Sequence, residues 1–110
     1  MTTVLSQTAL ENENHKYFGT GARSQENRSL GFRPAFMDKE TGIVYGSCFS
    51  DGQPAPFHLL DGLPEEVVLT RNPAGRVATV KSSVVSGFVL GQRFYTREQA
   101  AARAGHMQLH

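Results

Sequence analysis

Short apolar segments separated by turn-forming residues occupy most of the chain from Phe32 onward. Eleven glycines and five prolines are spread over 110 residues, and these two residue types interrupt regular structure most strongly. Short segments enriched in aromatic and β-branched side chains favour strands over helices. The sequence therefore predicts a small sheet built largely from hairpins, with few long elements.

The first predicted hairpin pairs residues 32–37 with residues 43–49. In the turn between them, Asp38 can bond back to the backbone, and Gly42 can take the positive φ that closes a bulged loop. Pro34 has no N–H to donate to a neighbouring strand. We therefore expect the first strand to lie at an edge of the sheet, or to begin only after Pro34.

The second predicted hairpin pairs residues 67–70 with residues 77–81. The turn between them, at residues 71–76, contains three turn-forming residues, which are Asn72, Pro73 and Gly75. This is the clearest hairpin signal in the chain.

A further strand is expected at residues 84–90, where Gly87 indicates a bulge or a close approach of another backbone. A tight turn at residues 91–92 then returns the chain through residues 93–95. Four or five strands in sequence make an antiparallel meander the simplest topology.

The sharpest local signal lies near the C-terminus, where Thr96 and Gln99 have the spacing of a capping box. Strong helix formers follow, and Gly105 is a ready C-cap, so the sequence predicts a helix over about residues 97–104. Two turns of helix are not stable alone in water, so this helix must pack on the sheet. We expect the contact to be made by three alanines with Tyr95 beside them, namely Ala100, Ala101 and Ala104.

Residues 1–30 are polar and give a much weaker pattern. Only a weak helix over about residues 3–11 is indicated, since its apolar residues do not form a sustained face. The predicted fold class is therefore α+β: a small antiparallel sheet of four to five short strands with a short C-terminal helix packed on it. This domain is expected to span residues 31–110, and residues 1–30 are expected to form a partly ordered polar N-terminal arm.

Cys48 is the only cysteine, so an intramolecular disulfide is impossible and a secreted, disulfide-stapled domain is excluded. The first residues lack the basic and apolar regions of a signal peptide. No stretch approaches the roughly 18 apolar residues that a membrane span requires. These features predict a cytoplasmic protein without a membrane partner.

Charge is divided unevenly along the chain, although the net charge is only +1. Residues 1–66 contain five Lys or Arg against nine Asp or Glu, a net charge of −4. Residues 67–110 contain six against one, a net charge of +5. An acidic part and a basic part can meet within the fold or between subunits, and either arrangement hides the asymmetry from outside partners.

The basic part supplies the candidate residues for binding nucleic acid or another acidic partner. Phosphate contacts need positive charge, and exposed aromatic rings beside that charge can stack on unpaired bases. Phe94 and Tyr95 lie in this part, although core packing explains them more simply. The candidate residues are Arg71, Arg76, Lys81, Arg93, Arg97 and Arg103.

Cys48 and His58 are the only pair that can support nucleophilic catalysis, with the thiolate as nucleophile and the imidazole as base. A small buried hydrophobic residue on a strand is the simpler interpretation of Cys48. His106 and His110 have the spacing of a zinc-binding pair, but they follow Gly105 in a predicted frayed tail and lack nearby carboxylates. We expect no catalytic residues, no metal site and no cofactor.

Open strand edges remain as the most suggestive feature, because small sheets commonly cover such edges by pairing or by docking a helix. The lead hypothesis is a small non-enzymatic binding or regulatory module that acts through protein–protein contacts, with another protein or with a second copy of itself. The alternative is a nucleic-acid-binding protein that uses the basic C-terminal part. The third hypothesis is a Cys/His-dependent enzyme.

Overall fold

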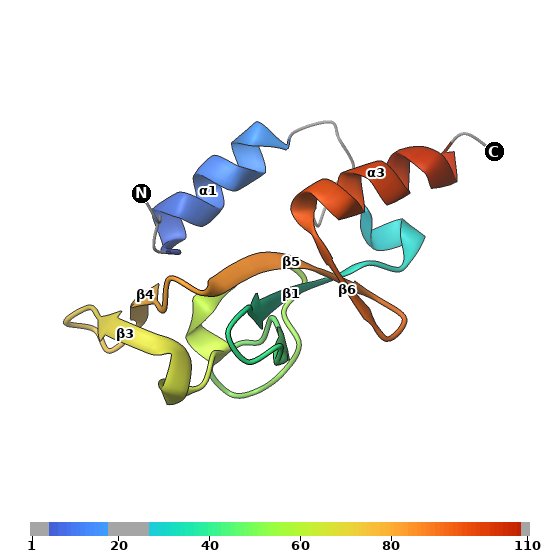
Figure 1. Ribbon diagram of the computed structural model, residues 1–110. Coiled ribbons are helices and arrows are strands. Elements are labelled where there is room, and N and C mark those ends of the chain that lie inside the picture. The colour runs from blue at the N-terminus through green and yellow to red at the C-terminus, as the bar shows by residue number, and fades with distance from the viewer. Residues whose placement is uncertain (1–4, 18–26, 109–110) are drawn as a thin grey trace.

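A computed structural model describes residues 5–17 and 27–108, with the backbone alone at residues 7, 14 and 106–108 (Figure 1). The fold is α+β, with a four-stranded antiparallel sheet in the order β2–β1–β5–β6 and a separate two-stranded sheet, β3–β4. The helices and strands are α1 (Gln7–Lys16), β1 (Arg33–Asp38), β2 (Val44–Gly46), β3 (Val68–Arg71), β4 (Val77–Val80), β5 (Val84–Leu90), β6 (Arg93–Thr96) and α3 (Arg97–Gln108). Three short 3-10 helices lie at Arg28–Leu30, Leu60–Gly62 and Glu65–Val67. The predicted fold class is confirmed.

Both predicted hairpins are present. β1 pairs with β2 and β3 pairs with β4, each in the antiparallel sense. Gly42 and Gly75 have the positive φ angles that close these turns, 76° and 82°. Asp38 bonds back to the backbone as expected, because its Oδ1 accepts a hydrogen bond of 2.9 Å from the N–H of Glu40.

The predicted meander is wrong, because β1 pairs with β5 as well as with β2. β3 and β4, which lie between β2 and β5 in the sequence, form their own small sheet beside the larger one (Figure 1). Ala35 and Phe36 of β1 are almost completely buried, so β1 needs a neighbour on both sides. Local turn signals cannot encode the pairing of two strands so far apart in the sequence.

The expectation that Pro34 marks an edge strand, or precedes the strand, is also wrong. Pro34 lies inside β1 and is paired with β5 on one side. On the other side β1 is paired with β2, which ends just before it reaches Pro34. Its carbonyl oxygen accepts a 2.9 Å hydrogen bond from Ser47 N, but Pro34 has no N–H to return to Ser47 O. Ala55 N donates to Ser47 O instead, at 2.9 Å. β2 therefore ends at Gly46, one residue before the carbonyl oxygen of Ser47, which would need the missing donor.

The core lies between the sheet and helices α1 and α3, which cover the same face of it (Figure 1). A larger cluster joins the N-terminal segment, the sheet and the β3–β4 hairpin, and consists of Leu5, Leu10, Phe36, Leu60, Leu63, Val67, Val77, Val80 and Val84. A smaller cluster lies under α3 and consists of Phe32, Phe88 and Ala100. The proposed division into an arm (1–30) and a domain (31–110) stays a prediction.

Helix α1 begins at Gln7, later than the weak helix predicted at about residues 3–11, and it runs further, to Lys16. Ser6 caps it, because its Oγ accepts a 3.2 Å hydrogen bond from Ala9 N. Leu10 is buried in the larger cluster and Ala9 packs against it, while most other described side chains of the helix are exposed or half-buried. So narrow an apolar stripe explains the weak pattern in the sequence.

Helix α3 has the predicted capping box. Thr96 N donates to Gln99 Oε1 at 3.0 Å, and Gln99 N donates to Thr96 Oγ1 at 3.2 Å. Ala100 and Ala104 are fully buried, which confirms the predicted contact with the sheet. The predicted end at residue 104 is wrong, because the helix continues to Gln108. Gly105 lies within the helix, where glycine is tolerated at a cost of about 1 kcal/mol relative to alanine.

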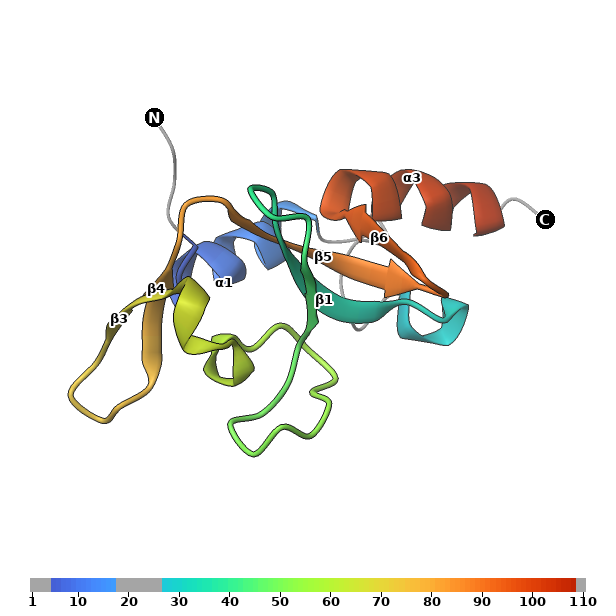
Figure 2. The same cartoon turned by 60° about the horizontal axis from the view of Figure 1, so that its bottom comes forward.

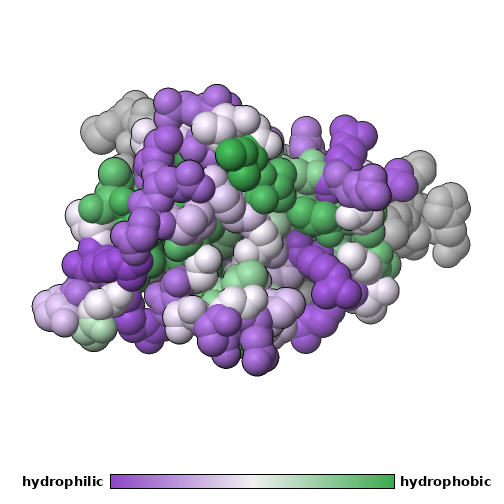
Figure 3. Space-filling model, turned by 90° about the horizontal axis from the view of Figure 1, so that it is seen from below, coloured by the Kyte–Doolittle hydropathy of each residue, from purple (hydrophilic) through white to green (hydrophobic). Residues whose placement is uncertain are grey.

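Figure 3 shows the molecule from below, where apolar areas are broken up by polar side chains. Gly87 confirms the predicted close approach, because a Cβ atom there would lie 2.3 Å from Tyr95 O and 2.4 Å from Cζ of Phe94. The register of β5 against its two neighbours shows no shift at Gly87, so no bulge forms.

Of the helices in the described ranges, none has the length and apolar character needed to cross a membrane.

Candidate functional site

Residues 47–57 form a small hairpin-like loop that leaves the end of β2 and leads toward the 3-10 helix at Leu60–Gly62; we call it the aromatic loop. Phe49 N donates to Gln53 O at 2.8 Å, and Ala55 N donates to Ser47 O at 2.9 Å. The loop projects away from the sheet in Figure 2, and a separate hollow lies on each of its two sides.

Ser47 closes the base of the aromatic loop. Its hydroxyl is buried, donates to Phe57 O at 2.7 Å and accepts from Leu59 N at 2.8 Å. These two bonds fix where the chain leaves the loop. The side chains of the loop are thereby held in place although the loop has little regular structure.

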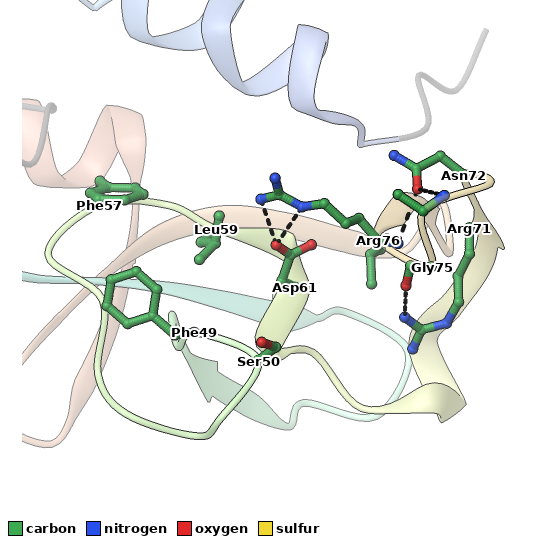
Figure 4. A pocket seen from close by; sticks show the side chains of 11 residues that line it. Phe49, Ser50, Phe57, Leu59, Asp61, Arg71, Asn72, Gly75 and Arg76 are labelled. Atoms are coloured by element: carbon green, nitrogen blue, oxygen red, sulfur yellow. Dashed lines mark hydrogen bonds and ion pairs between the residues drawn. The ribbon is translucent and has the colours of Figure 1, made fainter.

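The first hollow is a groove of about 920 Å³ between the aromatic loop and the turn of the β3–β4 hairpin (Figure 4); we call it the aromatic groove. Phe49 and Phe57 form the wall on the loop side. Arg71 and Arg76 come from the hairpin on the other side. The remaining residues that line it are Ser50, Leu59, Asp61, Asn72, Ala74, Gly75 and Val77.

Phe49 and Phe57 pack edge to face, with ring centroids 6.1 Å apart and an angle of 88° between the rings. Their exposed fractions are 38% and 45%, and neither residue belongs to a core cluster. Exposed apolar side chains that lie together, unlike ones scattered singly, are candidates for an interaction surface. The pair therefore marks the groove as a candidate binding surface.

The hairpin side of the groove is organised by ion pairs. Arg76 reaches across the groove to Asp61, with Nε and Nη2 at 3.0 and 2.7 Å from Oδ2 (Figure 4). Arg71 donates to Gly75 O at 2.8 Å and is paired with Glu65. Of the charged groups that line the groove itself, two are guanidinium groups and one is a carboxylate. Both guanidinium groups are ion-paired, so the groove is apolar on one side and polar with balanced charge on the other.

The second hollow, of about 570 Å³, lies on the other side of the aromatic loop; we call it the arginine pocket. Its walls come from the start of β1, the end of β2 and the loop itself. Of the described residues that line it, Arg28 and Arg33 are the charged ones, and Cys48 also faces it. The other lining residues are Gly31, Phe32, Pro34, Gly46, Ser47, Pro54, Ala55 and Pro56.

The basic residues singled out in the sequence do not gather on one surface. Five ion pairs between described residues each join an acid of residues 1–66 to a base of residues 67–110. The two charged parts of the chain thus meet within the fold. Arg71, Arg76, Lys81 and Arg97 take part in these pairs, Arg93 lies over the ring of Tyr95 at 5.1 Å, and Arg103 is exposed on α3.

Lys81 illustrates how far this neutralisation goes. Its Nζ lies 3.2 Å from Asp38 Oδ2 and 3.3 Å from Glu40 Oε2, at the turn of the first hairpin. Hydrogen bonds to these two carboxylates raise the pKa of Lys81, so the lysine stays charged but is locally balanced. Such a group offers an external phosphate little net attraction.

Arg97 is buried, with only 3% of its side chain exposed, and lies at the centre of a polar network. Its Nε donates to Ser86 Oγ at 3.2 Å and lies 3.5 Å from Glu13 Oε2, while Ser86 Oγ donates to the same carboxylate at 2.6 Å. Its Nη2 lies 3.1 Å from His58 Nδ1. The network joins α1, β5, α3 and the segment after the aromatic loop, so Arg97 serves the fold rather than an external partner.

His58 is held as a neutral imidazole. Its Nε2 lies 2.6 Å from the carbonyl oxygen of Gly87, which can only accept, so Nε2 carries the proton. Its Nδ1 then accepts from Arg97. Burial and the nearby Arg97 charge lower the pKa of His58 to about 3. Because both ring nitrogens are engaged, neither is available to deprotonate Cys48.

The two histidines with the spacing of a zinc-binding pair lie near the C-terminus. His110 and the side chain of His106 lie outside the described residues. Elsewhere, the described part of the chain contains no group of three or more potential metal ligands.

Phe49, Phe57, Arg28 and Arg33 are not among the predicted site residues. One signal in the sequence points to the two aromatic residues, because they border a segment rich in glycine and proline, where exposed loops are expected. Nothing local distinguishes the two arginines, since they lie in the acidic part of the chain. Comparison with protein-family models, curated proteins and solved structures gives no match for this chain. The fold is a small α+β domain, and its groove places two exposed aromatic rings opposite two ion-paired arginines.

Proposed function

We propose that this chain is a small, non-enzymatic binding or regulatory module that holds a segment of a partner protein in the aromatic groove. The exposed, edge-to-face pair of Phe49 and Phe57 carries the proposal. Phenylalanine and arginine are enriched at protein–protein interfaces, and the groove places both types around one hollow. We also propose a cytoplasmic location, because a chain with a single cysteine cannot form the internal disulfides that are typical of small secreted domains.

The chemistry of the lining favours a particular kind of segment. An apolar side chain of the partner packs against the two rings, where it excludes water from both. Arg71 and Arg76 are each ion-paired, with Glu65 and Asp61, so the hairpin side adds guanidinium N–H donors rather than net charge. The partner segment is therefore apolar, and polar acceptors beside its apolar side chain, such as backbone carbonyl oxygens, bind toward the two guanidinium groups.

A displayed peptide library tests the proposal, because it samples many apolar segments at once. Peptides selected on the wild-type chain are measured against a Phe49→Ser/Phe57→Ser variant and against an Ile43→Ser/Val44→Ser control. The control removes two exposed apolar side chains that do not line the groove. We expect the groove variant to weaken binding by about tenfold or more and the control to leave it unchanged.

Amide chemical shifts locate the bound peptide and decide the outcome. Shifts at the aromatic loop and the β3–β4 turn support the groove, and equal binding by both variants contradicts it. Light scattering after size exclusion is run in parallel. A dimer that the groove variant disrupts identifies a second copy as the partner, whereas a dimer unaffected by that variant rules out self-association through the groove.

The nucleic-acid alternative is the weaker of the two. Four of its six residues are ion-paired within the chain, and the others do not extend along a common groove. Nucleic-acid binding depends on counterion release, which requires cations that are not already neutralised. A titration with single- and double-stranded oligonucleotides at low salt checks this alternative, for which strong, salt-sensitive binding is the result required.

A further inference from the structure

The arginine pocket lies on the opposite side of the aromatic loop from the proposed protein-binding groove. Its volume of about 570 Å³ lies within the range of about 300–1,000 Å³ that is usual for small-molecule sites. It is therefore a second candidate site with a different size and a different lining.

Charge distinguishes the two hollows most clearly. Arg76 in the aromatic groove is bound to Asp61, whereas neither Arg28 nor Arg33 is ion-paired within the described ranges. Among the described residues, none that lines the arginine pocket is acidic. Four of the other eight described Lys and Arg residues are ion-paired, whereas Arg28 and Arg33 are not and border the same hollow.

Arg28 is already positioned. Its Nη2 donates to Pro56 O at 3.1 Å, which ties the 3-10 helix at Arg28–Leu30 to the aromatic loop. A guanidinium group has five N–H donors in a fixed plane, so this bond leaves others for a ligand. Holding the group in place reduces the entropy that binding would cost.

The rest of the pocket is mainly apolar. Phe32, Pro34 and Ala55 are buried side chains that contribute to its wall, and two further prolines come from the loop. An apolar wall bordered by two arginines fits a ligand that has an apolar body and an anionic end.

We propose that the arginine pocket binds a small organic oxyanion, a carboxylate or a phosphate monoester on an apolar body. The oxyanion accepts charge-assisted hydrogen bonds from Arg28 and Arg33. The apolar body packs against the proline and phenylalanine wall and displaces water from it. The site is independent of the aromatic groove, because the two hollows share no lining residue.

Four probes separate the two parts of the ligand: benzoate, phenyl phosphate, neutral benzyl alcohol and inorganic phosphate. Each is titrated into the full chain while amide shifts are followed. Benzoate or phenyl phosphate should shift residues of the pocket wall and should slow alkylation of Cys48 by iodoacetamide, since Cys48 faces the pocket. Benzyl alcohol lacks the charge and inorganic phosphate lacks the apolar body, so both should bind at least about tenfold more weakly.

Matched arginine variants test the assignment. Arg33→Gln should weaken binding of the better organic anion about tenfold, because one charge-assisted contact is lost. Arg93→Gln removes an equally exposed arginine that lines neither hollow and should leave binding unchanged. Equal binding of benzyl alcohol, or an unaltered affinity in Arg33→Gln, overturns the proposal.

The groove variant keeps this test separate from the proposed function. Phe49→Ser/Phe57→Ser should retain anion binding, because neither ring lines the arginine pocket. Loss of peptide binding with retained anion binding therefore supports both sites, and anion-induced shifts confined to the groove count against the pocket.

Discussion

Helices α1 and α3 lie on the same face of the sheet, yet different kinds of contact determine where each one forms. α3 has its start encoded in four consecutive residues, through the reciprocal bonds of Thr96 and Gln99. α1 is held mainly by residues distant in sequence, because Leu10 packs in the larger core cluster and Glu13 contacts Ser86 and Arg97. Local capping therefore predicts one helix well, whereas tertiary contacts determine the other.

Leu10→Ala provides the largest expected effect on this comparison. Leu10 is fully buried, and truncation of such a leucine costs about 2–5 kcal/mol through lost burial and the cavity left behind. Urea unfolding measures the change. Leu69→Ala is the control, since Leu69 is exposed on β3 and should change stability by less than about 0.5 kcal/mol. Equal effects of the two variants would mean that α1 is not held by the core.

Glu13→Gln tests the polar contact between the helices. The change removes the carboxylate that faces the buried Arg97 and should cost about 1–3 kcal/mol, because the guanidinium keeps its burial but loses its counter-charge. Glu11→Gln, on an exposed position of the same helix, is the matched control and should be nearly neutral. A double-mutant cycle with Arg97→Met isolates the coupling, and a coupling of zero would remove Glu13 from the account.

Acidification should weaken the same junction through His58. The imidazole is neutral in both the folded and the unfolded chain well above pH 6.5, but its pKa is about 3 in the folded state. Between these values the unfolded chain binds a proton that the folded chain does not, so stability falls with falling pH by up to about 1.4 kcal/mol per pH unit from this residue.

Urea unfolding at several pH values measures this slope, with His58→Gln for comparison. The variant keeps a polar side chain but cannot titrate in this range. Identical slopes in both proteins would show that His58 is not the group responsible.

Thr96→Ala should have the smallest effect of the four, about 1 kcal/mol, because it removes the hydroxyl that accepts from Gln99 N. Gln99→Ala removes the reciprocal bond and should cost less, since the Thr96 cap remains. Urea unfolding and far-ultraviolet circular dichroism together check both. If neither variant lowers stability, α3 owes its position to its buried alanines alone.

The same distinction explains which features of the fold could be predicted. Turn closure at Gly42 and Gly75 and the capping box at Thr96 depend on neighbouring residues, so the sequence contains all the information needed. The pairing of β1 with β5 depends on residues more than forty positions apart, such as Asp38 and Val84. Their pairing follows from how the whole core packs, which no local pattern describes.

The candidate sites divide along the same line. The charge asymmetry is visible in the sequence, but which base meets which acid is not, and pairs such as Arg76 with Asp61 appear only in the fold. Phe49 and Phe57 come together because the hydroxyl of Ser47 bonds to the backbone at the far end of the aromatic loop and so closes its base. Neither contact follows from spacing along the chain.

Pro34 has a consequence for how this molecule meets other copies of itself in a crowded solution. Next to the end of β2, β1 is bordered by the aromatic loop instead of a partner strand, and borders without a partner strand are where stray chains ordinarily attach and seed aggregates. Pro34 offers no N–H there, and the N–H of Phe32 already bonds to Asn27 O at 3.4 Å. An incoming strand finds no donor at these two positions, so the residue that shortens β2 also protects the sheet from growing by accident.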